Sequence, residues 1–126
     1  MIAVDTSALM AIVLGEAEAD ACMDALEAEA DLLISAGTVA EALIVAGRRN
    51  VFEEMSALID GLGFTIVPVS AAASRLIARA YAQWGRGAHP ARLNFGDCFA
   101  YALAKEHDCP LLFVGEDFAR SDLTAA

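Results

Sequence analysis

The sequence predicts an α/β fold with a mainly parallel central sheet of four or five short strands, flanked by helices. Short apolar runs alternate along the chain with longer stretches of helical periodicity. The apolar runs are continuous, which is typical of strands buried on both faces. Acidic residues recur directly after these runs or in the first turn of the following helix. Strands that alternate with helices in this way form parallel sheets covered on both sides.

Length and composition predict a single domain over residues 1–126, because no linker or repeat divides the chain. The longest stretch without a charged residue, Gly61 to Ser74, is too short to cross a bilayer and is broken by Pro68, so we expect no membrane association. The start of the chain has no basic region and soon reaches Asp5, unlike a secretory signal. We therefore expect a soluble, cytoplasmic protein.

The cysteines and histidines argue against a disulfide framework or a zinc site. Cys22, Cys98 and Cys109 lack CxxC spacing and lie among apolar residues, so we expect buried, reduced thiols. The chain has 2 histidines and no HExxH motif, which disfavours a histidine-based metalloenzyme.

The charge is strongly acidic and unevenly distributed. The formal net charge is -10, from 8 basic and 18 acidic residues, which argues against broad, nonspecific binding to nucleic acid. From Met1 to Asp31 the chain has acids and no base. This first quarter would suit a basic partner better than it would suit RNA.

The first half of the chain is expected to alternate strands and helices. An apolar run from Ile2 to Val4 ends at Asp5, and the next helix breaker is Gly15. An acidic helix, a second strand and a helix that carries Glu41 in its first turn follow. The expected elements are strand 2–4, helix 8–14, helix 16–30, strand 32–34 and helix 38–49.

The second half continues the alternation, with helix 51–62, strand 64–67, helix 70–84, loop 85–92 and strand 111–114. Between the loop and the last strand, Asn94 can cap a helix that ends before Cys109. Phe95, Phe99 and Leu103 should form its apolar face, which leaves Asp97 free to point elsewhere. In helix 70–84 the residues expected to face inward are Leu76, Ile77, Ala80 and Tyr81.

Four acids share a position at a strand end or in a first helical turn: Asp5, Glu41, Asp97 and Asp117. Each has an ordinary explanation, because acids cap and stabilise helix starts. Asp5 and Asp117 can be caps or turn residues. Thr38 with Glu41 fits a capping box, and Asn94 with Asp97 fits the same motif with a shorter acid.

The joint pattern indicates more than capping, because these positions gather at one sheet edge in an open α/β fold. Crowded carboxylates repel, and without a cation some of them must take up protons. Hard oxygen ligands without histidine or cysteine select Mg²⁺, with Mn²⁺ as a possible substitute, over zinc or copper.

In this order, D-T-S-A at Asp5, N-F-G-D ending at Asp97 and G-E-D-F around Asp117 resemble a PIN-domain ribonuclease of the VapC toxin type. The resemblance covers essentially the whole chain and implies a three-layer PIN-like fold. It also implies a Mg²⁺-dependent endoribonuclease, the toxin of a type II toxin-antitoxin pair, which hydrolyses RNA phosphodiester bonds. A cognate VapB-like antitoxin would inhibit it, and a homodimer is expected.

The resemblance also assigns roles to residues. Asp5 and Asp97 match the principal metal ligands, and Glu41 and Asp117 match the other two acids of a catalytic quartet. Glu116 and Asp122 are alternatives to Asp117. Two more residues match polar positions that line the pocket, although each can equally be a cap or a surface group: Ser7 and Asn94. The number of ions, one or two, stays open.

RNA would need local positive charge on this acidic chain. Arg86 and Arg92, in the loop before Asp97, are the first candidates for phosphate contacts, unless they are simply solvated. Three further arginines stand behind them: Arg48, Arg49 and Arg120. An apolar groove for an antitoxin helix is expected from Leu9, Ile12, Val13, Met23 and Leu26, unless these residues are core.

Three other functions compete with that of a ribonuclease. A DNA-directed nuclease would use the same acids. A phosphatase of the haloacid dehalogenase type would want an acid two residues after its nucleophile, where this chain has Ser7. A non-catalytic binding module would use its acids only to cap helices.

Overall fold

The four strands form one parallel sheet in the order β3-β2-β1-β4. In this computed structural model, which describes residues 1–126, β1 (Ile2–Val4) pairs with β2 (Leu32–Ser35) and β4 (Leu111–Leu112). The β3 strand (Thr65–Val67) pairs with β2. The predicted α/β fold class is therefore confirmed, with four strands. Because all four strands are parallel, their carboxyl ends meet at one edge.

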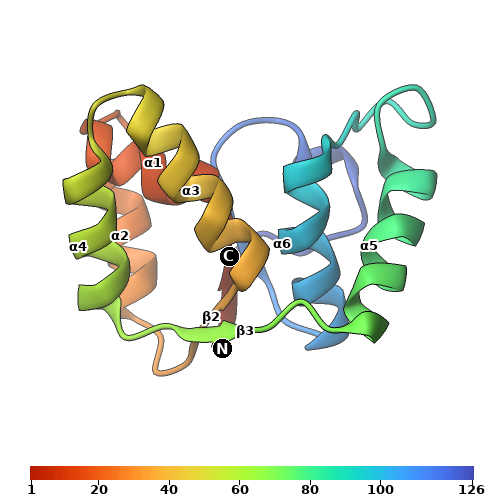
Figure 1. Cartoon of the computed structure of the whole chain (residues 1–126), viewed down its shortest axis with the longest axis horizontal. Coiled ribbons are helices and arrows are strands. Elements are labelled where there is room, and N and C mark those ends of the chain that lie inside the picture. Colours follow the sequence, from red (N-terminus) through yellow and green to blue (C-terminus); the bar gives the residue numbers. More distant parts are fainter.

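Helices cover both faces of the sheet and create three layers (Figure 1). One side holds α1 (Thr6–Leu14), α2 (Ala19–Glu27), α3 (Ala36–Arg48) and α4 (Phe52–Leu62), and the other holds α5 (Ala71–Trp84) and α6 (Phe95–Glu106). A short 3₁₀ helix, η1 (Phe118–Arg120), follows β4. Alternate residues of β1, β2 and β4 enter opposite cores: in β1, Ile2 and Val4 join the first, and Ala3 joins the second.

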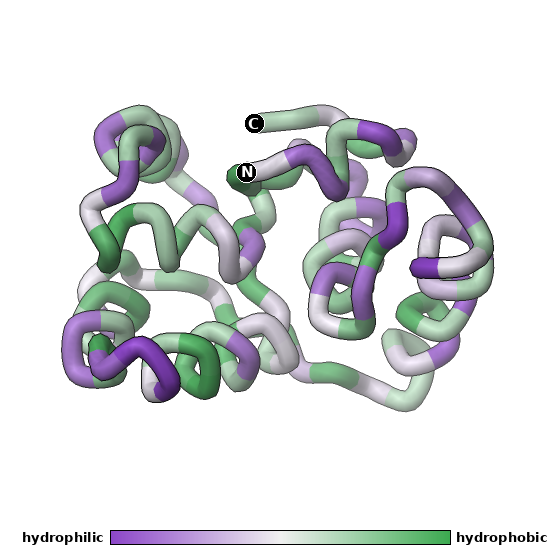
Figure 2. Tube along the Cα trace, turned by 90° about the horizontal axis from the view of Figure 1, so that it is seen from above, coloured by the Kyte–Doolittle hydropathy of each residue, from purple (hydrophilic) through white to green (hydrophobic).

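The view from above shows the two groups of helices on either side of the strands (Figure 2). Both chain ends lie between these groups, because Met1 precedes β1 and Ala125 bridges to Leu111 in the neighbouring strand. The hydropathy colours alternate along the helices, as expected for helices with one covered face.

Several element boundaries differ from the sequence prediction, most of them by one or two residues. The α3 helix begins at Ala36 and not at Thr38, because the Ser35 Oγ accepts a hydrogen bond from the Gly37 N–H at 3.1 Å and caps the helix there. The α2 helix is shorter than residues 16–30. The last strand stops at Leu112, before the half-buried Phe113 and Val114.

Two aromatic residues that were expected to face inward are exposed. Tyr81 on α5 is 42% exposed, and Phe95 at the first position of α6 is 69% exposed. Helical periodicity identifies an apolar stripe, but only the packing of neighbouring elements decides how far along the helix that stripe is covered. Conversely, Leu9 and Leu26 are fully enclosed in the first core, so they do not line a surface groove.

The three cysteines carry free thiols: Cys22 and Cys98 are buried, as expected, whereas Cys109 is only half-buried. None of the helices has both the length and the apolar character needed to cross a bilayer.

Truncating Leu9 should destabilise the whole fold rather than one surface. Leu9→Ala removes a side chain with 0% exposure and should lower the free energy of unfolding by about 2–5 kcal/mol. The matched control, Ile44→Ala, changes a side chain that is 58% exposed on α3 and should stay within about 0.5 kcal/mol of the parent. Urea unfolding measures both, and equal losses would contradict the assignment of Leu9 to the core.

Candidate functional site

Four elements bring acids to the carboxyl edge of the sheet. Asp5 follows β1 and is the N-cap of α1, and Glu41 lies on α3, the helix after β2. Asp97 lies in the first turn of α6, and Asp117 follows β4. The charges of Asp5, Asp117 and Glu41 all act on Asp97 and raise its pKa. Acids that are far apart in the sequence therefore share one region of the molecule.

Asp5 is buried, with 3% of its surface exposed, and only one of its oxygens is engaged. Its Oδ2 accepts hydrogen bonds from the Ser7 N–H at 3.0 Å and the Ser7 hydroxyl at 2.7 Å. Its Oδ1 is buried without a partner. The pKa of Asp5 is raised to about 6, mainly by burial and in part by the charge of Glu41, against the opposing effect of the Ser7 hydrogen bonds.

Ser7 also links two segments that are distant in sequence. Its Oγ accepts a hydrogen bond from the Val114 N–H at 3.0 Å while its hydroxyl donates to Asp5. The start of α1 is thereby fixed to the segment that leads from β4 toward Asp117. Ser7 therefore orients Asp5 in addition to completing the helix cap.

Asp97 is also largely buried, at 8% exposed. The predicted capping box is confirmed: the Asn94 N–H donates to Asp97 Oδ2 at 2.9 Å, and the Asp97 N–H donates to Asn94 Oδ1 at 2.8 Å. The pKa of Asp97 is raised to about 7, mainly by desolvation and in part by the neighbouring acids, against the opposing effect of the Asn94 hydrogen bond. The cap uses one carboxylate oxygen and leaves Oδ1 free of protein donors.

Glu41 is held by a contact that the sequence does not reveal. The Thr6 hydroxyl donates a hydrogen bond to Glu41 Oε1 at 2.6 Å. Glu41 Oε2 lies against Gly96, where a Cβ atom would overlap it, so this glycine permits the close approach of α3 and α6. The predicted capping box with Thr38 is wrong, because Ser35 caps α3 and Thr38 is fully buried inside the helix.

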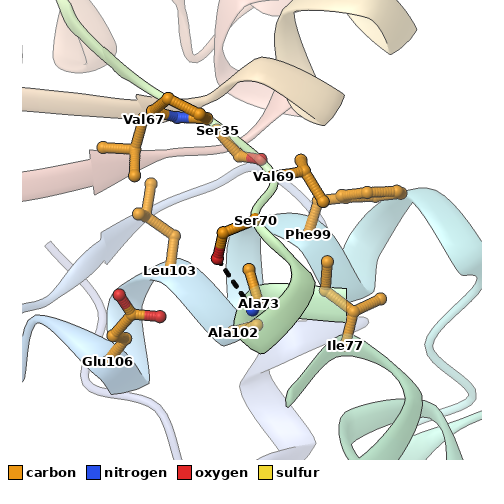
Figure 3. Close-up of a pocket in the computed structure, with 11 residues that line it drawn as sticks. Ser35, Val67, Val69, Ser70, Ala73, Ile77, Phe99, Ala102, Leu103 and Glu106 are labelled. Carbon is orange, nitrogen blue, oxygen red and sulfur yellow. Dashed lines mark hydrogen bonds between the residues drawn. The ribbon is translucent and has the colours of Figure 1, made fainter. Parts of the chain in front are cut away.

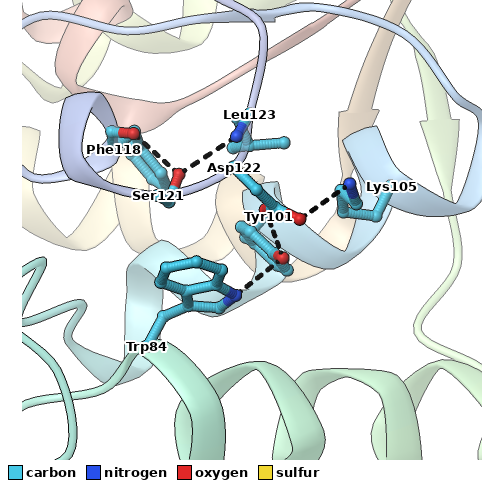
Figure 4. Close-up of polar contacts among 7 residues, drawn as sticks. All are labelled: Trp84, Tyr101, Lys105, Phe118, Ser121, Asp122 and Leu123. Carbon is cyan, nitrogen blue, oxygen red and sulfur yellow. Dashed lines mark hydrogen bonds and ion pairs between the residues drawn. The ribbon is translucent and has the colours of Figure 1, made fainter.

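Asp117 is exposed and makes no cap hydrogen bond with η1. Of its two predicted alternatives, Asp122 is engaged elsewhere: it accepts hydrogen bonds from the Tyr101 hydroxyl at 2.7 Å and from Lys105 Nζ at 3.0 Å (Figure 4). These contacts lower the pKa of Asp122, although desolvation opposes them. Glu116 is exposed next to Asp117, but the charge that acts on Asp97 is that of Asp117.

The donor set fits a hard divalent cation in its chemistry. Asp5, Glu41 and Asp97 each have one oxygen fixed by a protein donor and a second oxygen that takes no protein hydrogen bond. Carboxylate oxygens of this kind suit Mg²⁺ or Mn²⁺. As the side chains lie, no three acidic, histidine or cysteine groups stand close enough together to hold a metal ion. Binding would therefore draw the free oxygens inward.

Beside the acids lies a polar pocket that contains three arginines, which we call the arginine pocket. Arg86 and Arg92 come from the loop before α6, and Arg120 comes from η1. Asn94, Glu116 and Asp117 complete its polar lining. The loop arginines were singled out in the sequence, but their convergence with Arg120 was not.

The sequence also missed a chain of polar contacts behind this pocket. The Trp84 Nε1–H donates to the Tyr101 hydroxyl at 2.8 Å, which in turn donates to Asp122 (Figure 4). Trp84 is half-buried at the end of α5. No sequence pattern could reveal these contacts, because their partners are 17 and 21 residues apart.

A different pocket, between the β3 edge and helices α5 and α6, is mainly apolar (Figure 3). Val67, Val69, Ile77, Phe99 and Leu103 line it, and Glu106 is its single acid. It contains none of the four clustered acids and therefore does not supply their chemistry.

The raised pKa of Asp97 predicts a stability change with pH. The folded chain holds a proton up to about pH 7 that the unfolded chain releases near the ordinary value of 3.8. The stabilising contribution of this group is therefore present below about pH 4 and lost as the pH rises through about 7. Without divalent metal, Asp97→Asn should melt several degrees above the parent at pH 8, and the difference should vanish near pH 4. Calorimetry in buffer that contains a chelator tests this prediction. A lower melting temperature for Asp97→Asn than for the parent at pH 8 would contradict it.

Comparisons with known proteins agree with this arrangement. The sequence matches the PIN domain family over residues 2–122. It is 43% identical over 128 aligned residues to the VapC ribonuclease Mb2780c of Mycobacterium bovis and to the ribonuclease VapC42 of Mycobacterium tuberculosis, covering 98% of this chain and 97% of each relative.

Solved structures share the fold at low sequence identity. VapC20 of Mycobacterium tuberculosis, a toxin that cleaves the sarcin-ricin loop, superposes with a TM-score of 0.78 at 19% identity, over 100% of this chain and 98% of that one. A VapBC2 complex of Rickettsia felis bound to promoter DNA gives 0.72 at 14% identity, over 100% and 98%. The chain belongs to the PIN-domain family, within its group of VapC ribonucleases.

Proposed function

We propose that this chain is a Mg²⁺-dependent endoribonuclease and the toxin of a type II toxin-antitoxin pair, acting in the cytoplasm. The observation that carries the proposal is the burial of Asp97 within the field of Asp5, Glu41 and Asp117, which raises its pKa to about 7. Repulsion within such a cluster destabilises the folded chain. Acids with strongly shifted pKa values are concentrated at functional sites, so the cluster indicates a function. Membership of the VapC group supports the choice of RNA as substrate.

In this proposal Asp5 and Asp97 hold the ion, while Glu41 and Asp117 complete the quartet. Mg²⁺ or Mn²⁺, when bound, supplies a Lewis acid that activates water and neutralises charge on the phosphoryl group. Ser7 holds one oxygen of Asp5 and Asn94 holds one oxygen of Asp97, which leaves the second oxygen of each acid open to the ion.

Glu41 is suited to orient the attacking water. The Thr6 hydroxyl fixes its Oε1, and Oε2 takes no protein hydrogen bond. A carboxylate that is held in place and retains a free oxygen can accept a proton from water during hydrolysis of the phosphodiester. Arg86 and Arg92 supply positive charge for the RNA backbone next to these acids. No protein nucleophile is required.

The rival hypothesis of a binding module, in which the acids only cap helices, explains part of the site. It accounts for Asp5 and for Asp97, which make cap hydrogen bonds. It does not account for Glu41, which lies beyond the first turn of α3, or for Asp117, which makes no cap hydrogen bond. A DNA-directed nuclease remains the second candidate on the same acids, and an oligonucleotide with a 2′-deoxy substitution at the cleavage site separates it from a ribonuclease.

The partner that we propose is a VapB-like antitoxin. Two structural neighbours support this choice: the VapBC2 complex of Rickettsia felis, and a structure described as a toxin-antitoxin complex of Klebsiella pneumoniae, with a TM-score of 0.73 at 20% identity. In this chain Asp20, Asp24 and Glu27 are exposed on α2 and offer an acidic face to a basic segment. A homodimer belongs to the same proposal, with Phe95, which is 69% exposed at the start of α6, as an apolar side chain for a second copy to cover.

Neutralising Asp97 should abolish cleavage without unfolding the chain. Asp97→Asn keeps an acceptor for the Asn94 N–H but removes an ion ligand, so RNA cleavage with Mg²⁺ should fall at least about 100-fold and growth arrest on expression should be relieved. The control is Asp60→Asn, which removes one charge from an exposed position on α4 and should cleave as the parent does. Sequencing of RNA ends measures the cleavage, and full activity of Asp97→Asn would remove this residue from the site.

A further inference from the structure

We infer that the arginine pocket binds a second RNA phosphate, next to the one that is cleaved. This inference rests on the proposed ribonuclease function and deepens it. The pocket has a volume of about 260 Å³, and three guanidinium groups line it: Arg86, Arg92 and Arg120. They are three of the 8 basic residues in a chain with a net charge of -10. Their convergence is therefore a local departure from the overall charge.

None of these three arginines is neutralised by an ion pair. The two ion pairs of the chain join Met1 to Glu29 and Lys105 to Asp122. Glu116 and Asp117 also line the pocket but lie beyond ion-pair distance of any arginine. Like charges that converge without a partner are unfavourable, and an anion would relieve their repulsion.

The loop that carries Arg86 and Arg92 is held in one conformation by its own backbone. Gly85 bridges to Leu93, and the Arg86 N–H donates to the Leu93 carbonyl at 3.1 Å. Ala91 and Leu93 are buried in the second core. Arg92 has a φ of 55°, in the left-handed region that residues with a side chain rarely adopt. Such strain persists where the surroundings impose it, often at binding sites.

The wall that carries Arg120 is anchored through the polar contacts of Figure 4. Asp122, two residues further on, is held by Tyr101 and Lys105 from α6. Trp84 ties this wall to the loop, because its ring packs edge-on against His89 at 4.5 Å while its Nε1–H donates to Tyr101. Both walls are therefore ordered before a ligand arrives, which lowers the entropy lost on binding.

Two residues connect the arginine pocket to the acids. Asn94 lines the pocket and also caps the helix that carries Asp97. Asp117 lines the pocket and acts electrostatically on Asp97. A phosphate in the pocket is thus adjacent to the acid site. One RNA strand could therefore place the cleaved phosphate at the acids and the neighbouring phosphate in the pocket. The carboxylate of an acidic peptide is the competing occupant, and it presents two charged oxygens to arginine just as a phosphodiester does. The position of the pocket beside the acid site therefore favours RNA over such a peptide.

The first test uses an oligoribonucleotide in which the linkage next to the cleaved one is a neutral methylphosphonate. With the unmodified chain, this replacement should lower kcat/KM about tenfold, because one charge-assisted contact is lost. Arg86→Gln combined with Arg120→Gln should cause a similar loss with the normal RNA and no further loss with the modified one. Arg75→Gln, an exposed arginine on α5 outside the pocket, is the control and should respond to the modification as the parent does. If the methylphosphonate lowers kcat/KM of the double arginine variant by the same factor as it does in the parent, the inference is overturned.

The second test does not depend on cleavage. Inorganic phosphate is titrated into the chain while the Nε–H resonances of the arginines are followed by NMR. We expect shifts at Arg86, Arg92 and Arg120 and none at Arg75. Absence of shifts at the three pocket arginines, or equal shifts with acetate, would overturn the assignment to phosphate. If the chain cleaves no RNA, the proposed function fails, and this titration alone decides whether the pocket binds phosphate.

Discussion

The site depends on one constraint: Asp97 is buried near three other acids, so its ionisation is unfavourable. Desolvation and the charges of Asp5, Asp117 and Glu41 all oppose its ionisation, and the hydrogen bond from Asn94 offsets them only in part. The parallel sheet produces this situation, because it delivers the residues that follow β1 and β4 to the same edge as the helices α3 and α6. The fold thus maintains a concentration of negative charge that a hard cation would stabilise.

Short polar contacts convert this crowding into a defined arrangement. Ser7, Thr6 and Asn94 each donate to one oxygen of a different acid: Asp5, Glu41 and Asp97. In each case the second oxygen is left without a protein donor. Ser7 also accepts from Val114, and so connects the acid after β1 with the segment that leads to Asp117. The same residues that complete helix caps therefore orient the acids, and capping and function do not exclude one another here.

The sequence predicts the framework well, because the strands are short apolar runs and the acids stand at their ends. The parallel orientation of the strands and the Asn94–Asp97 capping box were both predicted from the sequence. The start of α3 does not, because Ser35 and Thr38 are both plausible caps and only the burial of Thr38 in the packed structure decides between them. The exposure of Phe95 was missed for a similar reason, since periodicity does not show where a covering element ends.

Contacts between distant segments were the least accessible from sequence. The hydrogen bond from Thr6 to Glu41 spans 35 residues, and the one from Val114 to Ser7 spans 107. No local pattern announces either of them. The arginine pocket belongs to the same class, since Arg120 meets the loop of Arg86 only because Tyr101 and Trp84 fix both segments against α5 and α6.

The most direct measurement of the central claim is an NMR titration of the aspartate side-chain carboxyl carbons, with and without Mg²⁺. Without the ion, the Asp97 carboxyl should titrate near pH 7 and that of Asp5 near pH 6. With saturating Mg²⁺, both should stay ionised to much lower pH, because the cation favours their charged forms. Titration of Asp97 near its ordinary value of 3.8, unchanged by Mg²⁺, would contradict the account.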